Sequence, residues 1–265
     1  QTGLAQKTYV PDNNFEQALI DLNYDDTLDD SVLTANISGV TSLVVNNEGI
    51  SDLTGIEAFT VLTHLDCGGT GSTANQLTTL DLSNNTALTT LYCHSNQLTS
   101  LDLSANTALL FLWTDSNPLT SLDLSSNTAL TYLHCESNQL TTLDVSSNTA
   151  LTYINCESNQ LTTLDVSSNT ALTYINCVSN QLTTLDVSSN TALTELNCGS
   201  NQLTTLDVSS TLTELNCGSN QLTSLDVSAN TALTKLDCRS NSLTSLDVSA
   251  NTALTDLRCN NNQLT

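Results

Sequence analysis

The chain has 265 residues, of which 27 are Asp or Glu and only four are Lys or Arg, so its formal net charge is −23 at pH 7. This balance argues against a nucleic-acid partner, because phosphate binding needs clustered Lys and Arg, and equally against an anionic membrane surface. No apolar run approaches the ~20 residues of a membrane-spanning helix, so the sequence predicts no membrane insertion.

The segment before the repeats, residues 1–39, is predicted to form a small helical cap. Asp12, which follows a proline, is typical of a helix start, and Phe15, Leu19 and Ile20 supply apolar side chains to the helix that follows. A stack of repeats needs such a cap, because its first turn would otherwise expose an apolar end to water.

An acidic segment inside the cap is similar to a calcium-binding loop. Asp21, Asn23 and Asp25 match the first ligand positions of an EF-hand loop, so Ca²⁺ is a candidate ligand of this segment. The match is partial, because the sixth position lacks Gly and Val32 stands where the twelfth-position Glu belongs. The alternative is a solvated acidic linker, and we expect no other cofactor or metal.

A sequence repeat of about 21 residues runs through residues 40–265, and its most regular copy lies between Leu140 and Gln160. A fixed period of this length is typical of a solenoid, in which each turn buries its apolar face against its neighbours. One column of the repeat holds all nine Cys, and we expect it to be a ladder of buried, reduced thiols, because no CxxC pair marks a metal site. The column comprises Cys67, Cys93, Cys135, Cys156, Cys177, Cys198, Cys217, Cys238 and Cys259, with Thr114 in one turn.

Each period contains the pattern LxxLxLxxN twice, and positions 4 to 7 alternate between apolar and polar residues. Through this pattern the chain resembles bacterial leucine-rich repeat proteins of the short, nested type, and its first segment is similar to the helical cap of internalins. We therefore expect a mainly β leucine-rich repeat solenoid with parallel sheets on both sides and a small N-terminal helical cap. The resemblance also implies a secreted or cell-surface protein that binds protein partners.

One of the two copies of the pattern varies from turn to turn at its outward positions, and we call it the variable copy. An Asn ends this copy in nearly every turn. Because an amide both donates and accepts, we expect these stacked side chains to satisfy backbone groups where the chain turns a corner. The column comprises Asn96, Asn117, Asn138, Asn159, Asn180, Asn201, Asn220, Asn241 and Asn262.

The other copy of the pattern hardly varies, and it carries an outward Asp in every turn. A face this uniform is poorly suited to an irregular partner, so we interpret it as a solvated polar surface. A row of bound Ca²⁺ or Na⁺ ions is the alternative. The column comprises Asp81, Asp102, Asp123, Asp144, Asp165, Asp186, Asp207, Asp226 and Asp247.

The outward positions of the variable copy gather the single Trp and four of the six Tyr. Exposed aromatic side chains rimmed by acids are typical of a recognition surface. The predicted partner-binding residues are Tyr92, His94, Phe111, Trp113, Asp115, Tyr132, His134, Glu136, Tyr153, Glu157 and Tyr174.

These features predict a non-enzymatic recognition or adhesion protein, secreted or on a bacterial cell surface, whose variable face binds a protein partner. Catalysis has little support, because no nucleophile has a base at suitable spacing and an open sheet offers no closed pocket. Carbohydrate binding and a structural spacer for a further C-terminal domain are the alternatives. Gln1 fits a mature, signal-cleaved N-terminus, and the stop at Thr265 in mid-repeat leads us to expect a truncated, uncapped last turn.

Overall fold

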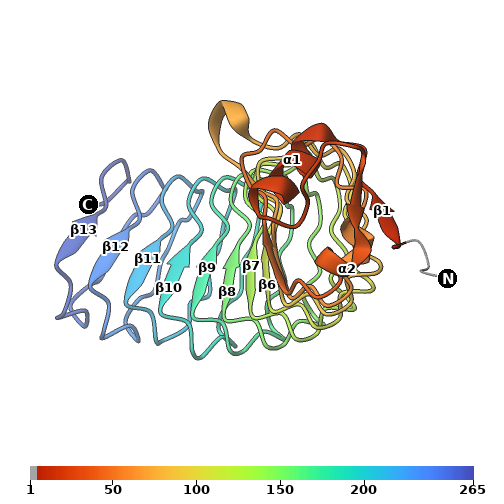
Figure 1. Cartoon of the computed structure of the whole chain (residues 1–265). Helices are drawn as coiled ribbons and strands as arrows, with labels where there is room; N and C mark the ends of the chain where they lie inside the picture. Colours follow the sequence, from red (N-terminus) through yellow and green to blue (C-terminus); the bar gives the residue numbers. More distant parts are fainter. Residues whose placement is uncertain (1–4) are drawn as a thin grey trace. The chain divides into compact units, whose positions relative to one another are not determined.

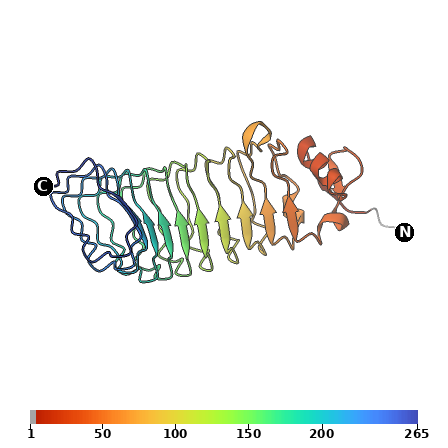
Figure 2. The ribbon, with the colours of Figure 1, turned by 90° about the vertical axis from the view of Figure 1, so that its left-hand side faces the viewer.

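The computed structural model describes residues 5–265, so the predicted mature N-terminus at Gln1 lies outside the described range. The chain divides into two compact units, of which the first ends at Leu130 and the second begins at Thr131. Within each unit, successive turns place their strands side by side (Figures 1 and 2).

The first unit begins with the elements of the predicted cap. Helix α1 (Asn13–Asp21) starts at Asp12, whose Oδ1 accepts hydrogen bonds from the backbone N–H groups of Asn14 and Phe15 at 2.9 and 3.0 Å. The other carboxylate oxygen of Asp12 accepts from the N–H and hydroxyl of Ser51, which ties the helix to the first turns of the solenoid. The predicted helix start is confirmed.

Two short strands and a second helix complete this region. Strand β1 (Lys7–Tyr9) pairs antiparallel with β2 (Ser31–Leu33), and α2 (Thr34–Ile37) follows directly. The division into a cap and a solenoid at residue 40 stays a prediction.

Each later turn of the first unit contributes one short strand to a parallel sheet, with consecutive strands paired in register. These strands are β3 (Ser42–Val44), β4 (His64–Asp66), β5 (Thr90–Tyr92) and β6 (Phe111–Trp113), and two short 3-10 helices, η1 (Ile56–Ala58) and η2 (Gly71–Thr73), lie in the connections.

The second unit repeats the same arrangement without a cap. Its strands pair parallel and in register from one turn to the next. They are β7 (Tyr132–His134), β8 (Tyr153–Asn155), β9 (Tyr174–Asn176), β10 (Glu195–Asn197), β11 (Glu214–Asn216), β12 (Lys235–Asp237) and β13 (Asp256–Arg258).

The interior of each turn is a layer of aliphatic and thiol side chains. In the turn that contains β8, the side chains of Leu151, Ile154, Cys156, Leu161 and Val166 have no exposed surface. All nine cysteines are free thiols on this inward column, and only the last of them is partly exposed. The prediction of a mainly β leucine-rich repeat solenoid, with an inward Cys column, is therefore confirmed.

The predicted Asn column closes one corner of the coil in the expected way. Asn159 donates from Nδ2 to the carbonyls of Cys156, in its own turn, and Cys135, in the preceding turn, at 3.1 and 3.0 Å. Its Oδ1 accepts the N–H of Leu140 at 3.0 Å, again in the preceding turn. One side chain thus satisfies backbone groups of two turns, and Asn180 repeats the pattern one turn later.

A second Asn column, which the sequence analysis did not single out, performs the same task at another corner. Asn169 donates from Nδ2 to the carbonyls of Val145 and Asn148, both at 2.9 Å. Asn190 donates to Val166 and Asn169 one turn later, at 3.0 and 2.9 Å. These side chains have no exposed surface, so buried amides hold two corners of each regular turn.

The prediction of parallel sheets on both sides was wrong in its second sheet. Among the described residues the invariant copy forms no strand, and its isolated β-bridge joins Asp186 to Asp207. Eight of the nine outward Asp residues accept the N–H of the Ser two residues later, as Asp144 does from Ser146 at 2.9 Å.

We predict that Asn159→Ala lowers the free energy of unfolding by about 3 kcal/mol, because it leaves the buried N–H of Leu140 without its partner, at a cost of ~1–3 kcal/mol, and removes one of the two amide bonds to each of the Cys135 and Cys156 carbonyls. Urea unfolding followed by far-ultraviolet circular dichroism measures the change. The exposed neighbour Gln160 is the control, and Gln160→Ala should shift stability by less than about 0.5 kcal/mol. Equal losses in the two variants would contradict the corner role.

The buried thiols should make the fold sensitive to alkali. Burial raises the pKa of Cys93 and Cys156 to about 12 and that of Cys238 to about 11. A raised folded-state pKa stabilises the fold fully below the unfolded thiol pKa of about 8.5, and this contribution is lost as the pH rises toward the folded value.

We therefore expect the free energy of unfolding to fall from roughly pH 8.5 upward, with a limiting slope of about 1.4 kcal/mol per pH unit for each thiol. Urea unfolding at a series of pH values measures this slope, and Cys156→Ala should make it shallower. An unchanged slope in that variant would assign alkaline unfolding to other groups.

Candidate functional site

The strands of the first unit present two outward rows of side chains on one face of the sheet. The middle residue of each strand, such as Leu91 or Leu112, is buried, so the residues on either side of it point outward. The register places His64, Thr90 and Phe111 in one row and Asp66, Tyr92 and Trp113 in the other.

Trp113 is the centre of an aromatic cluster in this unit. Its ring stacks on His94, with centroids 4.8 Å apart, and meets Tyr92 edge to face at 5.7 Å. Trp113 Nε1 donates to Asp115 at 2.6 Å, which fixes the indole orientation. Phe111 is 41% exposed on the same face, so the predicted residues of this unit do lie together.

Gly68 makes room for this cluster. A Cβ atom at that position would lie within 2.4 Å of the His94 ring, so any larger residue would displace the imidazole from its place beside Trp113. The sequence analysis did not count Gly68 among the site residues, although its position one turn before His94 in the same outward column was a signal that could have found it.

The second unit carries a stack of three tyrosines. Tyr132, Tyr153 and Tyr174 occupy one outward row on β7, β8 and β9. Their ring centroids are 4.2 and 4.5 Å apart and the rings are within 10° of parallel. These separations are close to the spacing of adjacent strands, so the rings stand upright on the sheet and turn their edges toward solvent.

Burial within the stack favours the neutral form of these phenols. Burial raises the pKa of Tyr153 and of Tyr174 above the ordinary value for a phenol. Both hydroxyl groups are therefore neutral at physiological pH, and each can donate as well as accept a hydrogen bond.

Buried amides hold the predicted acidic residues beside this stack. Asn155 Nδ2 lies 2.9 Å from His134 Nε2 and donates to Glu136 Oε2 at 3.1 Å. Asn176 Nδ2 donates to Glu157 Oε2 at 2.7 Å. Both amides are less than a tenth exposed. The sequence analysis did not count them as site residues, although their outward column was the signal that could have found them.

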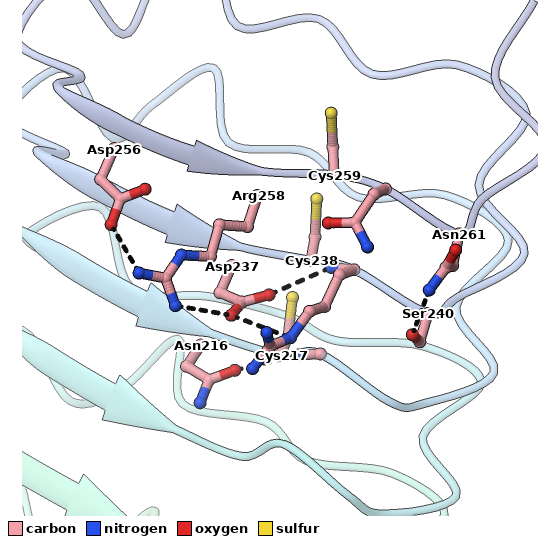
Figure 3. A network of polar contacts seen from close by, with 12 residues as sticks. Asn216, Cys217, Asp237, Cys238, Ser240, Asp256, Arg258, Cys259 and Asn261 are labelled. Carbon is pink, nitrogen blue, oxygen red and sulfur yellow. Dashed lines mark hydrogen bonds and ion pairs between the residues drawn. The ribbon is translucent and has the colours of Figure 1, made fainter.

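The far end of the same face carries mixed charges (Figure 3). Arg239 Nε lies 3.3 Å from Asp237, and Arg258 reaches both Asp256 at 3.3 Å and Asp237 at 4.0 Å. Lys235 pairs with Glu214 at 2.7 Å. Three bases and three acids thus neutralise one another over β11 to β13.

The invariant face has a different character. Hydrogen bonds from Ser146 and Ser167 lower the pKa of Asp144 and Asp165, so these exposed carboxylates are charged at neutral pH. Ser hydroxyls and N–H groups therefore offset part of the repulsion along the row. Cation binding by this column stays a prediction.

The predicted calcium ligands lie at the end of α1. Asp21 is its last residue and accepts from Gln17 Nε2 at 2.8 Å, and Asn23 adopts a left-handed backbone with φ of 62°. Burial and the nearby Glu16 raise the pKa of Asp25, which opposes its ionisation. Calcium binding by these three residues stays a prediction.

Comparison with known proteins places the chain in a structural class. Its fold is similar to that of the functional domain of InlJ from Listeria monocytogenes, described as including a cysteine ladder, with 44% identity and a TM-score of 0.91 over 100% of this chain and 59% of that chain. InlF from strain 4b F2365 of Listeria monocytogenes is 27% identical, with a TM-score of 0.75 over 97% of this chain and 84% of that one. The fold is thus that of a leucine-rich repeat protein.

Sequence comparison also shows similarity to an internalin. Internalin J of Listeria monocytogenes serotype 4b (strain F2365) is 46% identical over 81 residues, which are 29% of this chain and 8% of that protein. No protein-family model matches the chain. The chain is an internalin-like bacterial leucine-rich repeat protein, and it spans less than two thirds of the length of both InlJ relatives.

The described part of the chain, residues 5–265, contains no helix with the length and apolar character needed to cross a bilayer. The binding role of the predicted site residues stays a prediction, although each unit gathers its own members on one face.

We predict that His94→Gln changes the emission of Trp113, the single Trp, because the His94 ring stacks on the indole with centroids 4.8 Å apart. Fluorescence spectra of the folded proteins at one fixed pH measure the change. His64→Gln, whose ring contacts Tyr92, is the control and should retain the wild-type spectrum. Identical spectra for wild type and His94→Gln would contradict the stack.

Proposed function

We propose that this chain is a secreted or cell-surface bacterial recognition or adhesion protein, without catalytic activity, that binds a protein partner through its variable aromatic and acidic face. One observation carries the proposal: the rare aromatic side chains concentrate on the outward positions of one copy of the repeat while the other copy stays constant. The similarity to internalins, which span a longer chain, supports the same class of function.

The ring geometry favours a protein over a carbohydrate partner. A sugar ring stacks on an exposed aromatic face, but both faces of Tyr153 are covered, by Tyr132 and Tyr174. One face of Trp113 is likewise covered by His94. Upright rings offer edges and hydroxyl groups instead, which suit the apolar and polar side chains of a protein surface.

In the test, the purified chain is immobilised and exposed to extracellular protein preparations and to an array of glycans, and the bound proteins or glycans are identified. The capture is repeated with variants of the chain. Binding of the purified captured protein to the chain is then measured by calorimetry. A glycan that binds with the same dependence on the tyrosines would favour the carbohydrate alternative, and no partner in either arm would favour the spacer.

We predict that Tyr132→Ala combined with Tyr153→Ala weakens binding of the captured protein at least thirtyfold, because central aromatic side chains contribute about 2 kcal/mol or more each. Thr142→Ala with Thr163→Ala, two exposed positions on the invariant copy, is the control and should bind as wild type. Trp113→Ala tests the aromatic cluster of the first unit in the same way. Unchanged affinity in both the tyrosine double variant and Trp113→Ala would reject the proposed face.

A further inference from the structure

Positive charge is distributed unevenly over the protein, and each base has a defined partner. Lys7 pairs with Asp29 near the N-terminus at 2.7 Å. The other three bases lie at the far end of the second unit, where they pair with Glu214, Asp237 and Asp256. Among the described residues, no Lys or Arg forms an ion pair with Glu157 or Glu195, and Lys235 acts on Glu195 only through space, from two strands away.

Both of these carboxylates lie next to the tyrosine stack. Glu195 is directly beside Tyr174 in the register of β9 and β10. Glu157 follows β8 and is held by Asn176 Nδ2 at 2.7 Å, and Asn176 Oδ1 in turn accepts the N–H of Val178 at 3.2 Å. The Glu157 carboxylate is thus oriented in the free protein, which reduces the entropy that a partner must remove on binding.

An upright tyrosine stack flanked by carboxylates matches the two parts of a basic side chain. Lys and Arg bury their methylene stems along apolar surface while their charged heads remain in polar surroundings. The edges of Tyr153 and Tyr174 supply the apolar ridge, and Glu157 and Glu195 supply negative charge on it. The net charge of −23 attracts a cationic partner from a distance, and the ridge determines the position and orientation in which the partner binds.

We propose that the face of β8 to β10 docks a basic segment of a protein partner, with Lys or Arg stems along Tyr153 and Tyr174 and their charged groups on Glu157 and Glu195. This inference rests on the proposed function and adds the chemistry of the partner. The occupant is an extended, Lys- or Arg-bearing peptide segment, and the mixed-charge end at β11 to β13 marks the limit of the cationic contact.

The probe is a fluorescently labelled eight-residue peptide in which Arg alternates with Gly, and a peptide in which Glu replaces Arg is its counterpart. Fluorescence anisotropy measures the affinity of each peptide for the full chain. We expect the cationic peptide to bind, its affinity to fall as salt is raised, and the acidic peptide not to bind.

The decisive variant is Glu157→Gln with Glu195→Gln, which should weaken the cationic peptide about tenfold. Its matched control is Asp165→Asn with Asp186→Asn, which removes the same two charges, from −23 to −21, on the invariant copy. Asn can also accept the Ser N–H that each Asp accepts, so the control should fold and bind as wild type.

Three outcomes would overturn the inference: equal weakening in the two double variants, wild-type affinity in the Glu variant, or no binding of the cationic peptide. Equal urea midpoints exclude misfolding as the cause of any loss. The proposed function and this inference can fail separately. If binding of a captured protein depends on Tyr132 and Tyr153 but not on Glu157 and Glu195, the proposed function stands and the basic-segment inference is rejected.

Discussion

The constraint on which this structure depends is that many backbone groups of each turn find their hydrogen-bond partners in the neighbouring turns. Cys156 N–H bonds to the Asn176 carbonyl at 2.8 Å, and the buried amide of Asn180 reaches back to the Cys156 carbonyl at 3.0 Å. Orphaned buried backbone groups are costly, so a turn that slipped by one residue would lose several such bonds together. Constant inward and corner residues therefore hold neighbouring turns in register.

Fixed register explains how the outward residues of a unit can form ordered arrays. Because Tyr132, Tyr153 and Tyr174 occupy equivalent positions of successive turns, the strand spacing alone brings their rings into stacking distance. The same relation places Asn176 of one turn beneath Glu157 of the turn before it. The repeat thus converts a substitution at one position into a defined contact with the neighbouring turn.

The period, the inward cysteines, the Asn corner and the face shared by the aromatics of each unit were all predictable, because each follows from spacing along the chain. The second sheet was mispredicted because alternation of apolar and polar residues indicates an extended backbone but does not show whether neighbouring turns pair, and in the invariant copy pairing is limited to an isolated bridge between Asp186 and Asp207. The bonds from Asn155 and Asn176 to the glutamates, and the upright stacking of the tyrosines, depend on rotamers between turns. A pattern along one chain cannot specify those.

The placement of the four bases follows from the same geometry. Stacking equivalent positions brings like charges about 5 Å apart, so a row of acids on one face is costly unless something compensates it. The Asp column is compensated by its own serines, and Glu214, Asp237 and Asp256 are compensated by Lys235, Arg239 and Arg258. Among the described residues, Glu157 and Glu195 form no ion pair with Lys or Arg, and they lie beside the upright tyrosines. Carboxylates without an ion pair next to apolar edges are what a cationic partner would complement, which distinguishes this part of the face from the mixed-charge end at β11 to β13.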